Sequence, residues 1–114
     1  YLFYNCVNLT EVHVDEWDTS NVTDMGYAFN NCQSLKSLDL SKWDVHNVTT
    51  MHTMFAGIDT SNDYHSLETI GDVSRWDTSS LTSMYSMFYS CSKLKYVDVS
   101  NWDVSKVTNM NRLF

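Results

Sequence analysis

The sequence predicts an α/β solenoid: about four stacked units of 26 residues, each a strand, a turn and a short helix, with a parallel sheet along one side. Two independent markers recur with the same period. The dipeptide Trp-Asp occurs four times, at intervals of 26, 33 and 26 residues. Phenylalanine recurs at intervals of 26, 26, 33 and 26 residues, at Phe3, Phe29, Phe55, Phe88 and Phe114. The shared long interval indicates one repeat with an insertion in its third unit.

These markers divide residues 1–114 into a single repeat array with units at about 3–28, 29–54, 55–87 and 88–113. The third unit has Ile58 where the other units have cysteine, and about six extra residues before Leu67. One further residue, Gly71, is inserted in its strand region. The chain begins within a unit, ends on the first residue of another and lacks the polar caps of a complete array. We therefore expect a fragment of a longer array, with any anchor outside it.

Each unit is expected to contain a strand followed by a turn and a short helix. Leu38 and Leu40 alternate with polar residues, which is the period of a strand with one buried face. The same alternation occurs at Val12 and Val14, and at Val97 and Val99. Between Val48 and Phe55 the apolar residues are spaced by 3, 3 and 1, which predicts one or two helical turns. The Asp of each Trp-Asp pair precedes this stretch and is expected to accept backbone N–H bonds as a cap or a turn.

The second unit contains Leu35-x-x-Leu38-x-Leu40-x-x-Trp43, the form of a leucine-rich repeat with Trp in its last position. With Phe29-x-x-Cys32 before it and Asp44, Val48-Thr49 and Met51 after it, the unit resembles the BspA-like leucine-rich repeats of bacterial surface proteins. This repeat type is also found in mycoplasma lipoprotein domains of unknown function. The resemblance covers the whole chain. It implies an extracellular, cell-surface or secreted segment that mediates adhesion by binding a host or neighbouring-cell protein or glycan.

Composition and charge argue against several other classes of protein. The hydrophobic fraction of 43% and the aromatic fraction of 14% are too high for a disordered chain. The formal net charge is −7 and the seven Lys and Arg residues are scattered, which argues against a nucleic-acid partner. No apolar run approaches the roughly 18 residues of a membrane span, so we expect no direct membrane insertion in this segment.

The sequence gives little support for catalysis or for a resident cofactor. The four histidines lie at different positions of the repeat, so the repeat does not gather them. The sequence has no nucleophile elbow, phosphate loop or H-E-x-x-H motif. Repeated carboxylates alone keep a glycosidase or lyase as an alternative. We predict a protein without enzymatic activity.

Repeated columns of Trp, Asp and Cys side chains each admit two interpretations. For the Trp column we favour core packing over a sugar-binding surface. For the Asp column we favour turn formation over calcium binding, and therefore predict no metal site. For Cys6 and Cys32 we favour buried free thiols over a disulfide, which their expected separation would allow. The Thr column resembles the arrays of ice-binding solenoids only weakly. The Asp and Thr columns are Asp18, Asp44, Asp77 and Asp103, and Thr23, Thr49, Thr82 and Thr108.

Residues between the buried positions of the strands are expected to point outward and form one continuous acidic surface, here called the polar face. Leucine-rich-repeat proteins typically bind partners on the exposed face of their sheet, so the resemblance places a binding site there. Tyr96 is the one large aromatic on this face and a candidate anchor. The predicted binding residues of the polar face are Glu11, His13, Lys36, Asp39, Glu68, Asp72, Lys95, Tyr96 and Asp98.

The insertion at about 57–66 predicts a second binding surface, because insertions into one repeat form loops that often bind partners. Its candidate residues are Asp63, Tyr64 and His65. The alternative to both surfaces is a structural spacer, a stalk or a surface antigen without a dedicated ligand.

Overall fold

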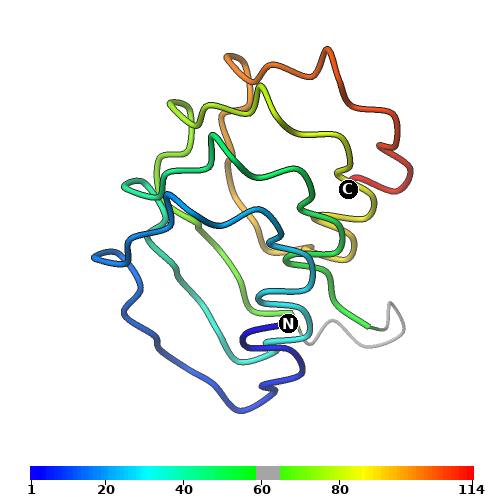
Figure 1. Ribbon diagram of the computed structural model, residues 1–114. Helices are drawn as coiled ribbons and strands as arrows, with labels where there is room; N and C mark the ends of the chain where they lie inside the picture. Colours follow the sequence, from blue (N-terminus) through cyan, green and yellow to red (C-terminus); the bar gives the residue numbers. More distant parts are fainter. Residues whose placement is uncertain (59–64) are drawn as a thin grey trace.

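Figure 1 shows a computed structural model in which segments one repeat apart in the sequence lie side by side. The structure describes residues 1–58 and 65–114. Within these ranges the chain forms turns and isolated parallel bridges, and no regular helix or strand. The fold is compact, with a radius of gyration of 13.0 Å. The bridges join Asp24 to Thr50, Thr50 to Ser83, Ser83 to Asn109, and Ser37 to Thr69.

The predicted helix between Val48 and Phe55 is wrong. The N–H groups of Met51, Thr53 and Phe55 donate to carbonyls of the third unit, at distances of 3.0, 2.8 and 3.0 Å. Within the segment, the bond from Met54 to the carbonyl of Met51 closes a tight turn. Thr53 has a positive φ of 56°, which a right-handed helix does not allow. A spacing of three between apolar residues therefore suits stacked turns as well as a helix.

The same pattern of bonds joins the other units. In the first and second units, Met25, Tyr27 and Phe29 donate to Thr50, His52 and Met54, at distances of 2.9–3.1 Å. In the third and fourth units, the acceptors of Met84, Ser86 and Phe88 are Asn109, Asn111 and Leu113. Each of these segments thus satisfies its backbone groups mainly on a neighbouring unit.

The predicted strands are reduced to a short pairing between the second and third units. The predicted inward and outward alternation is confirmed in the second unit, where Leu38 and Leu40 are buried and Asp39 is exposed. It is wrong in the fourth unit, where Val99 is 39% exposed and Val97 and Asp98 are both partly buried. The N–H groups of Leu38 and Leu40, two residues apart, donate to the adjacent carbonyls of Thr69 and Ile70. Gly71, the inserted residue, has a φ of +82°. This extra residue forms a bulge that interrupts the pairing.

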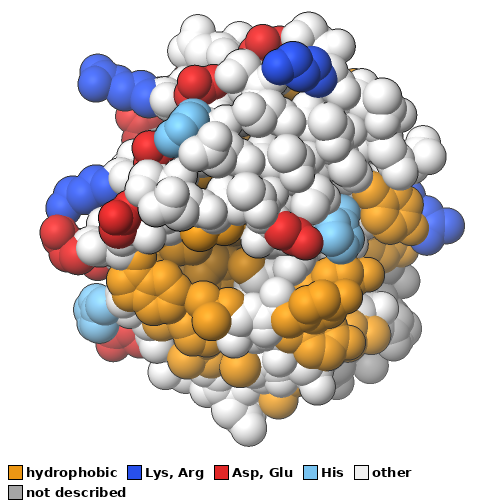
Figure 2. Space-filling view, in the orientation of Figure 1, with side chains coloured by type: hydrophobic (Ala, Val, Ile, Leu, Met, Phe, Trp, Pro, Cys, Tyr) orange, Lys and Arg blue, Asp and Glu red, His pale blue; other side chains and the backbone are white. Residues whose placement is uncertain are grey.

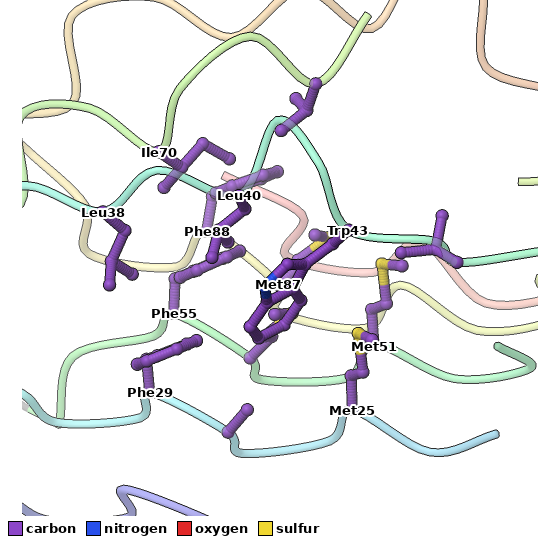
Figure 3. Packing of buried hydrophobic residues seen from close by; sticks show 14 of the residues in the cluster. Met25, Phe29, Leu38, Leu40, Trp43, Met51, Phe55, Ile70, Met87 and Phe88 are labelled. Atoms are coloured by element: carbon purple, nitrogen blue, oxygen red, sulfur yellow. The ribbon is translucent and has the colours of Figure 1, made fainter. Parts of the chain in front are cut away.

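The core is built from columns of identical side chains. Neighbouring rings of the Phe column stack with centroids 5.3–6.0 Å apart. Figure 3 shows Phe29, Phe55 and Phe88 following one another, with Trp43 and several methionines beside them. Phe29, Phe55 and Phe88 are at most 2% exposed. Offset stacked rings are a favoured aromatic contact, so each ring supports the one in the next unit.

The Trp column lies mostly in the core, as predicted. Trp43, Trp76 and Trp102 are at most 8% exposed, whereas Trp17 in the first unit is 41% exposed. Each buried indole N–H donates to a backbone carbonyl of the preceding unit; Trp43 donates to Val14 at 2.8 Å. These three rings are therefore unsuited to a sugar-binding surface.

The cysteines are free thiols in this structure. Cys32 is buried and its Sγ lies 3.2 Å from the carbonyl of Phe3, while Cys91 makes the same contact with Phe55 at 3.3 Å. Burial raises the pKa of Cys32 to about 11 and that of Cys91 to about 12. These two thiols pack as small apolar groups.

We expect the replacement Trp43→Phe to lower the free energy of unfolding by about 1–3 kcal/mol, because the carbonyl of Val14 loses its donor. The matched control is Trp17→Phe, at the exposed position of the same column. Within the described residues, the indole nitrogen of Trp17 donates no hydrogen bond. The control should change stability by less than about 0.5 kcal/mol. Urea unfolding followed by fluorescence measures both, and equal losses would contradict the role of the Val14 bond.

Thiol reactivity tests the packing of the cysteines. In the native protein at about pH 8, Cys32 and Cys91 should react slowly with Ellman's reagent, because the reactive thiolate is scarce at their raised pKa values. Both should react rapidly in denaturant. Mass spectrometry of labelled peptides identifies each thiol, and rapid native labelling of Cys32 or Cys91 would contradict the described packing.

Candidate binding face

Most of the predicted polar face borders two adjacent hollows in the surface. The first, of about 580 Å³, is lined by Glu68, Asp72, Lys95, Tyr96 and Asp98, together with Thr69, Gly71 and Ser74. The second, of about 390 Å³, contains three further predicted residues, Glu11, His13 and Asp39. Lys36 is exposed and lines neither hollow. The structure thus gathers eight of the nine predicted residues into two neighbouring sites.

Gly71 belongs to the wall of both hollows. A methyl group added to it would lie 2.6 Å from Oδ1 of Asp39 and 3.3 Å from the backbone nitrogen of Leu40. Its positive φ also disfavours any side chain. Glycine therefore lets the bulge approach Asp39 closely, at the border between the two sites.

The aspartates of the polar face are held in place by serines two residues further on. Oδ1 of Asp39 accepts bonds from the N–H and the hydroxyl of Ser41, at 3.0 and 2.6 Å. Asp72 and Ser74, and Asp98 and Ser100, repeat this arrangement. The hydroxyl bond, followed by the backbone bond, lowers the pKa of each of the three carboxyls. The three groups are ionised at neutral pH, with fixed orientations.

One lysine–carboxylate ion pair and one histidine–carboxylate contact lie on this face. Lys95 binds Glu68, and this bond lowers the pKa of Glu68. In the second hollow, His13 lies 3.0 Å from Glu11, with both side chains largely exposed. His13 takes the position in the first unit that Asp39, Asp72 and Asp98 occupy in the other units. Each hollow has three carboxylates in its wall, from Glu11, Asp15 and Asp39 in the second and from Glu68, Asp72 and Asp98 in the first, but only the first has a lysine.

Tyr96 is 75% exposed and lies between two hollows. Besides the first hollow, it lines a more apolar one of about 430 Å³ with Phe88, Cys91, Leu94 and Phe114. An exposed aromatic at such a border offers a large contact area at a small cost in side-chain entropy. The role of Tyr96 as an anchor stays a prediction.

The predicted insertion loop receives less support. His65 is only 6% exposed, so it cannot serve as a surface contact as expected. It lies against Gly57, where an added methyl group would be 3.1 Å from Cδ2 of His65. The end of the insertion thus folds back onto the core instead of projecting from it. Asp63 and Tyr64 lie outside the described residues.

The Asp column forms turns, as favoured from the sequence. Oδ1 of Asp18, Asp44, Asp77 and Asp103 each accepts the N–H of the residue two positions later, at 2.9–3.1 Å. The pKa of each carboxyl is lowered, first by a side-chain bond to that same residue. Among the described residues, no group of three His, Cys, Asp or Glu side chains could hold a metal ion.

The polar uncharged walls of the hollows come from residues that the alternation also places on the outer side, although they are not among the predicted binding residues. Thr69 lines both, and Ser74 lines the first while also fixing Asp72. The recurring Asp-x-Ser sequence was the signal that could have identified the paired serines. Figure 2 adds a second surface feature: exposed hydrophobic side chains gather over the first unit, where Tyr1, Leu2, Tyr4 and Trp17 are exposed.

The replacement Ser100→Ala should raise the pKa of Asp98 toward its ordinary value of 3.8, because the carboxylate loses its hydroxyl donor. The folded-state pKa lies below the unfolded one, so this carboxylate stabilises the fold above the unfolded pKa and the effect disappears as pH falls through the folded pKa. Carboxyl NMR titration measures the change, with Ser105→Ala as the control, because Ser105 binds Asp103 in the same unit and does not bind Asp98. An unchanged Asp98 titration would contradict the described turn.

Within residues 1–58 and 65–114 the structure contains no helix long and apolar enough to cross a membrane. No curated protein and no solved structure matches the chain. A family match covers it from end to end, over residues 1–66 and 62–114. The chain therefore belongs to the family described as "Mycoplasma protein of unknown function, DUF285".

Proposed function

We propose that the chain is a non-enzymatic leucine-rich-repeat segment of BspA-like type that acts at the cell surface and binds a protein or a glycan through its polar face. The family match and the sequence repeat support the BspA-like assignment. Bonds between corresponding positions of neighbouring units support a solenoid, which is the architecture of leucine-rich repeats. The surface location rests on the sequence resemblance alone.

The observation that carries the binding proposal is the gathering of Asp72, Asp98, Glu68 and Tyr96 around one hollow. A volume of about 580 Å³ is within the range of binding sites, and its rim combines fixed charges with one exposed aromatic. Aromatic residues surrounded by polar groups are the usual anchors of protein interfaces. Several units bearing such sites in one chain would add avidity.

The charges of the face favour binding over catalysis. A glycosidase needs one carboxyl whose pKa is raised, so that it stays protonated and can donate a proton. Every carboxyl pKa shift seen among the described residues is downward. Carboxylates of this kind attract cationic groups.

A structural spacer or surface antigen is the second candidate. The stacked Phe column and the backbone bonds between units favour it, because both stiffen a stack without requiring a ligand. A spacer would have no specific partner on the polar face, so replacing residues of this face would abolish no binding. The experiment below separates the two candidates.

A binding screen of the chain against matrix proteins and glycans, with and without calcium, tests the proposal. We expect at least one specific partner whose binding weakens about tenfold or more when Asp39, Asp72, Tyr96 and Asp98 are all replaced by alanine. The control replaces Asp18, Asp77, Asp103 and Tyr85, which are three other turn-forming aspartates and one exposed tyrosine. Circular dichroism checks that both variants fold.

Binding retained by the polar-face variant would move the site elsewhere on the molecule. No specific partner in the screen would favour the spacer. Equal losses in the polar-face variant and the control would indicate a general effect of charge, and the binding proposal would then be wrong.

A further inference from the structure

We propose that the hollow bordered by Asp72, Tyr96 and Asp98 binds an arginine side chain on an extended segment of a protein partner. This inference rests on the proposed function and specifies its partner: a polypeptide with exposed basic residues, in place of a glycan. It follows from the charge of the hollow, the geometry of its carboxylates and the position of the tyrosine.

The charge of the hollow favours a cation. Its wall contains three carboxylates, from Glu68, Asp72 and Asp98, against one ammonium group, from Lys95. Lys95 is engaged by Glu68, and neither Asp72 nor Asp98 forms an ion pair with a described residue, although the charge of Arg75 outside the hollow contributes to the lowered pKa of Asp72. Each of these two carboxylates has a lowered pKa and is ionised at neutral pH. A sulfated or carboxylated glycan would therefore be repelled from this site.

The two aspartates are ready to accept further hydrogen bonds. Ser74 and Ser100 bind Asp72 and Asp98 through Oδ1 only, and within the described part of the chain no bond to Oδ2 is seen. Because the serines fix each carboxylate, a ligand would not have to pay the entropy of ordering it. The mutual repulsion of Asp72 and Asp98 would also be relieved by a cation between them.

Tyr96 makes arginine a better fit than lysine. Its ring is 75% exposed and lines the same hollow as the two aspartates. A guanidinium group can lie flat on an aromatic ring while its N–H groups bind carboxylates in a forked geometry. The ammonium group of lysine is a compact point charge, so it cannot lie flat on the ring and bind a carboxylate in a forked geometry at the same time. The second hollow has Glu11, His13 and Asp39 but no tyrosine, so it lacks this combination.

The neighbouring surface fits an extended polypeptide on either side of the arginine. Tyr96 and Lys95 line both the acidic hollow and a neighbouring one whose wall includes Phe88, Leu94 and Phe114. A segment crossing Tyr96 could place a basic residue on one side and an apolar residue on the other. Side chains along an extended chain alternate in direction, which suits two neighbouring sites.

Fluorescence anisotropy with short peptides tests the inference on the whole chain. The probes alternate glycine with arginine, with lysine or with glutamate, and a sulfated oligosaccharide serves as an anionic glycan. We expect the arginine peptide to bind more tightly than the lysine peptide, and the glutamate peptide and the oligosaccharide not to bind. Binding should weaken at higher ionic strength, because the charges are exposed.

Two variants and one control locate the binding. Asp72→Asn with Asp98→Asn, and separately Tyr96→Leu, should each weaken binding of the arginine peptide by about fivefold or more. The control, Asp77→Asn with Asp103→Asn, makes the same change in net charge at two turn-forming aspartates of the same units outside the hollow. It should change the affinity by less than about twofold. Urea midpoints verify that all variants are folded.

If the hollow variant and the control lose affinity for the arginine peptide equally, the effect comes from net charge alone and the inference is wrong. An arginine peptide that fails to bind, or one that is unaffected by Tyr96→Leu, would also overturn it. A neutral glycan found in the broader screen, with binding lost on replacing Tyr96, would leave the proposed function standing while this inference fails. Binding partners that all ignore the polar face would remove both.

Discussion

Backbone hydrogen bonds between neighbouring units are the interaction on which the rest of this structure depends. A helix satisfies its own N–H and carbonyl groups, but the turns of this protein satisfy theirs on the next unit, as Phe29 does on Met54 and Phe55 on Met87. Side chains reinforce the same contacts. Thr49 donates both its N–H and its hydroxyl to the carbonyl of Thr23, and the indole of Trp43 donates to Val14.

This constraint explains why the repeat is so regular. A residue in one unit contacts its counterpart in the next, so identical side chains form columns, as the phenylalanines do. It also sets the positions of polar residues outside the core. Each turn aspartate accepts the backbone N–H of the residue two positions later. This bond holds the carboxylate at the same outer position in each unit. The charged surface with Asp72, Asp98 and Tyr96 is a by-product of the same stacking, and it supplies the site proposed for a partner.

The sequence predicts the period, the buried columns and the turn-forming aspartates, because these depend on residue type at fixed spacing. It does not predict the backbone between Val48 and Phe55, since a spacing of three fits both a helix and a row of turns. The positive φ of Thr53 decides between them, and a threonine gives no sign of it. The polar face could be predicted from alternation, but the positions of its two hollows, both lined by Thr69 and Gly71, could not. The burial of His65 could not be foreseen, because the insertion follows no repeat.

Long-range HNCO spectroscopy, which detects scalar coupling across individual hydrogen bonds, tests the central claim most directly. The account predicts couplings from the amide nitrogens of Met51 and Phe55 to the carbonyl carbons of Ser83 and Met87 in the next unit. Couplings from these amides to carbonyls four residues earlier, at Asn47 and Met51, would show a helix instead. That result would contradict the stacking of units by backbone bonds and the positions of the side chains that follow from it.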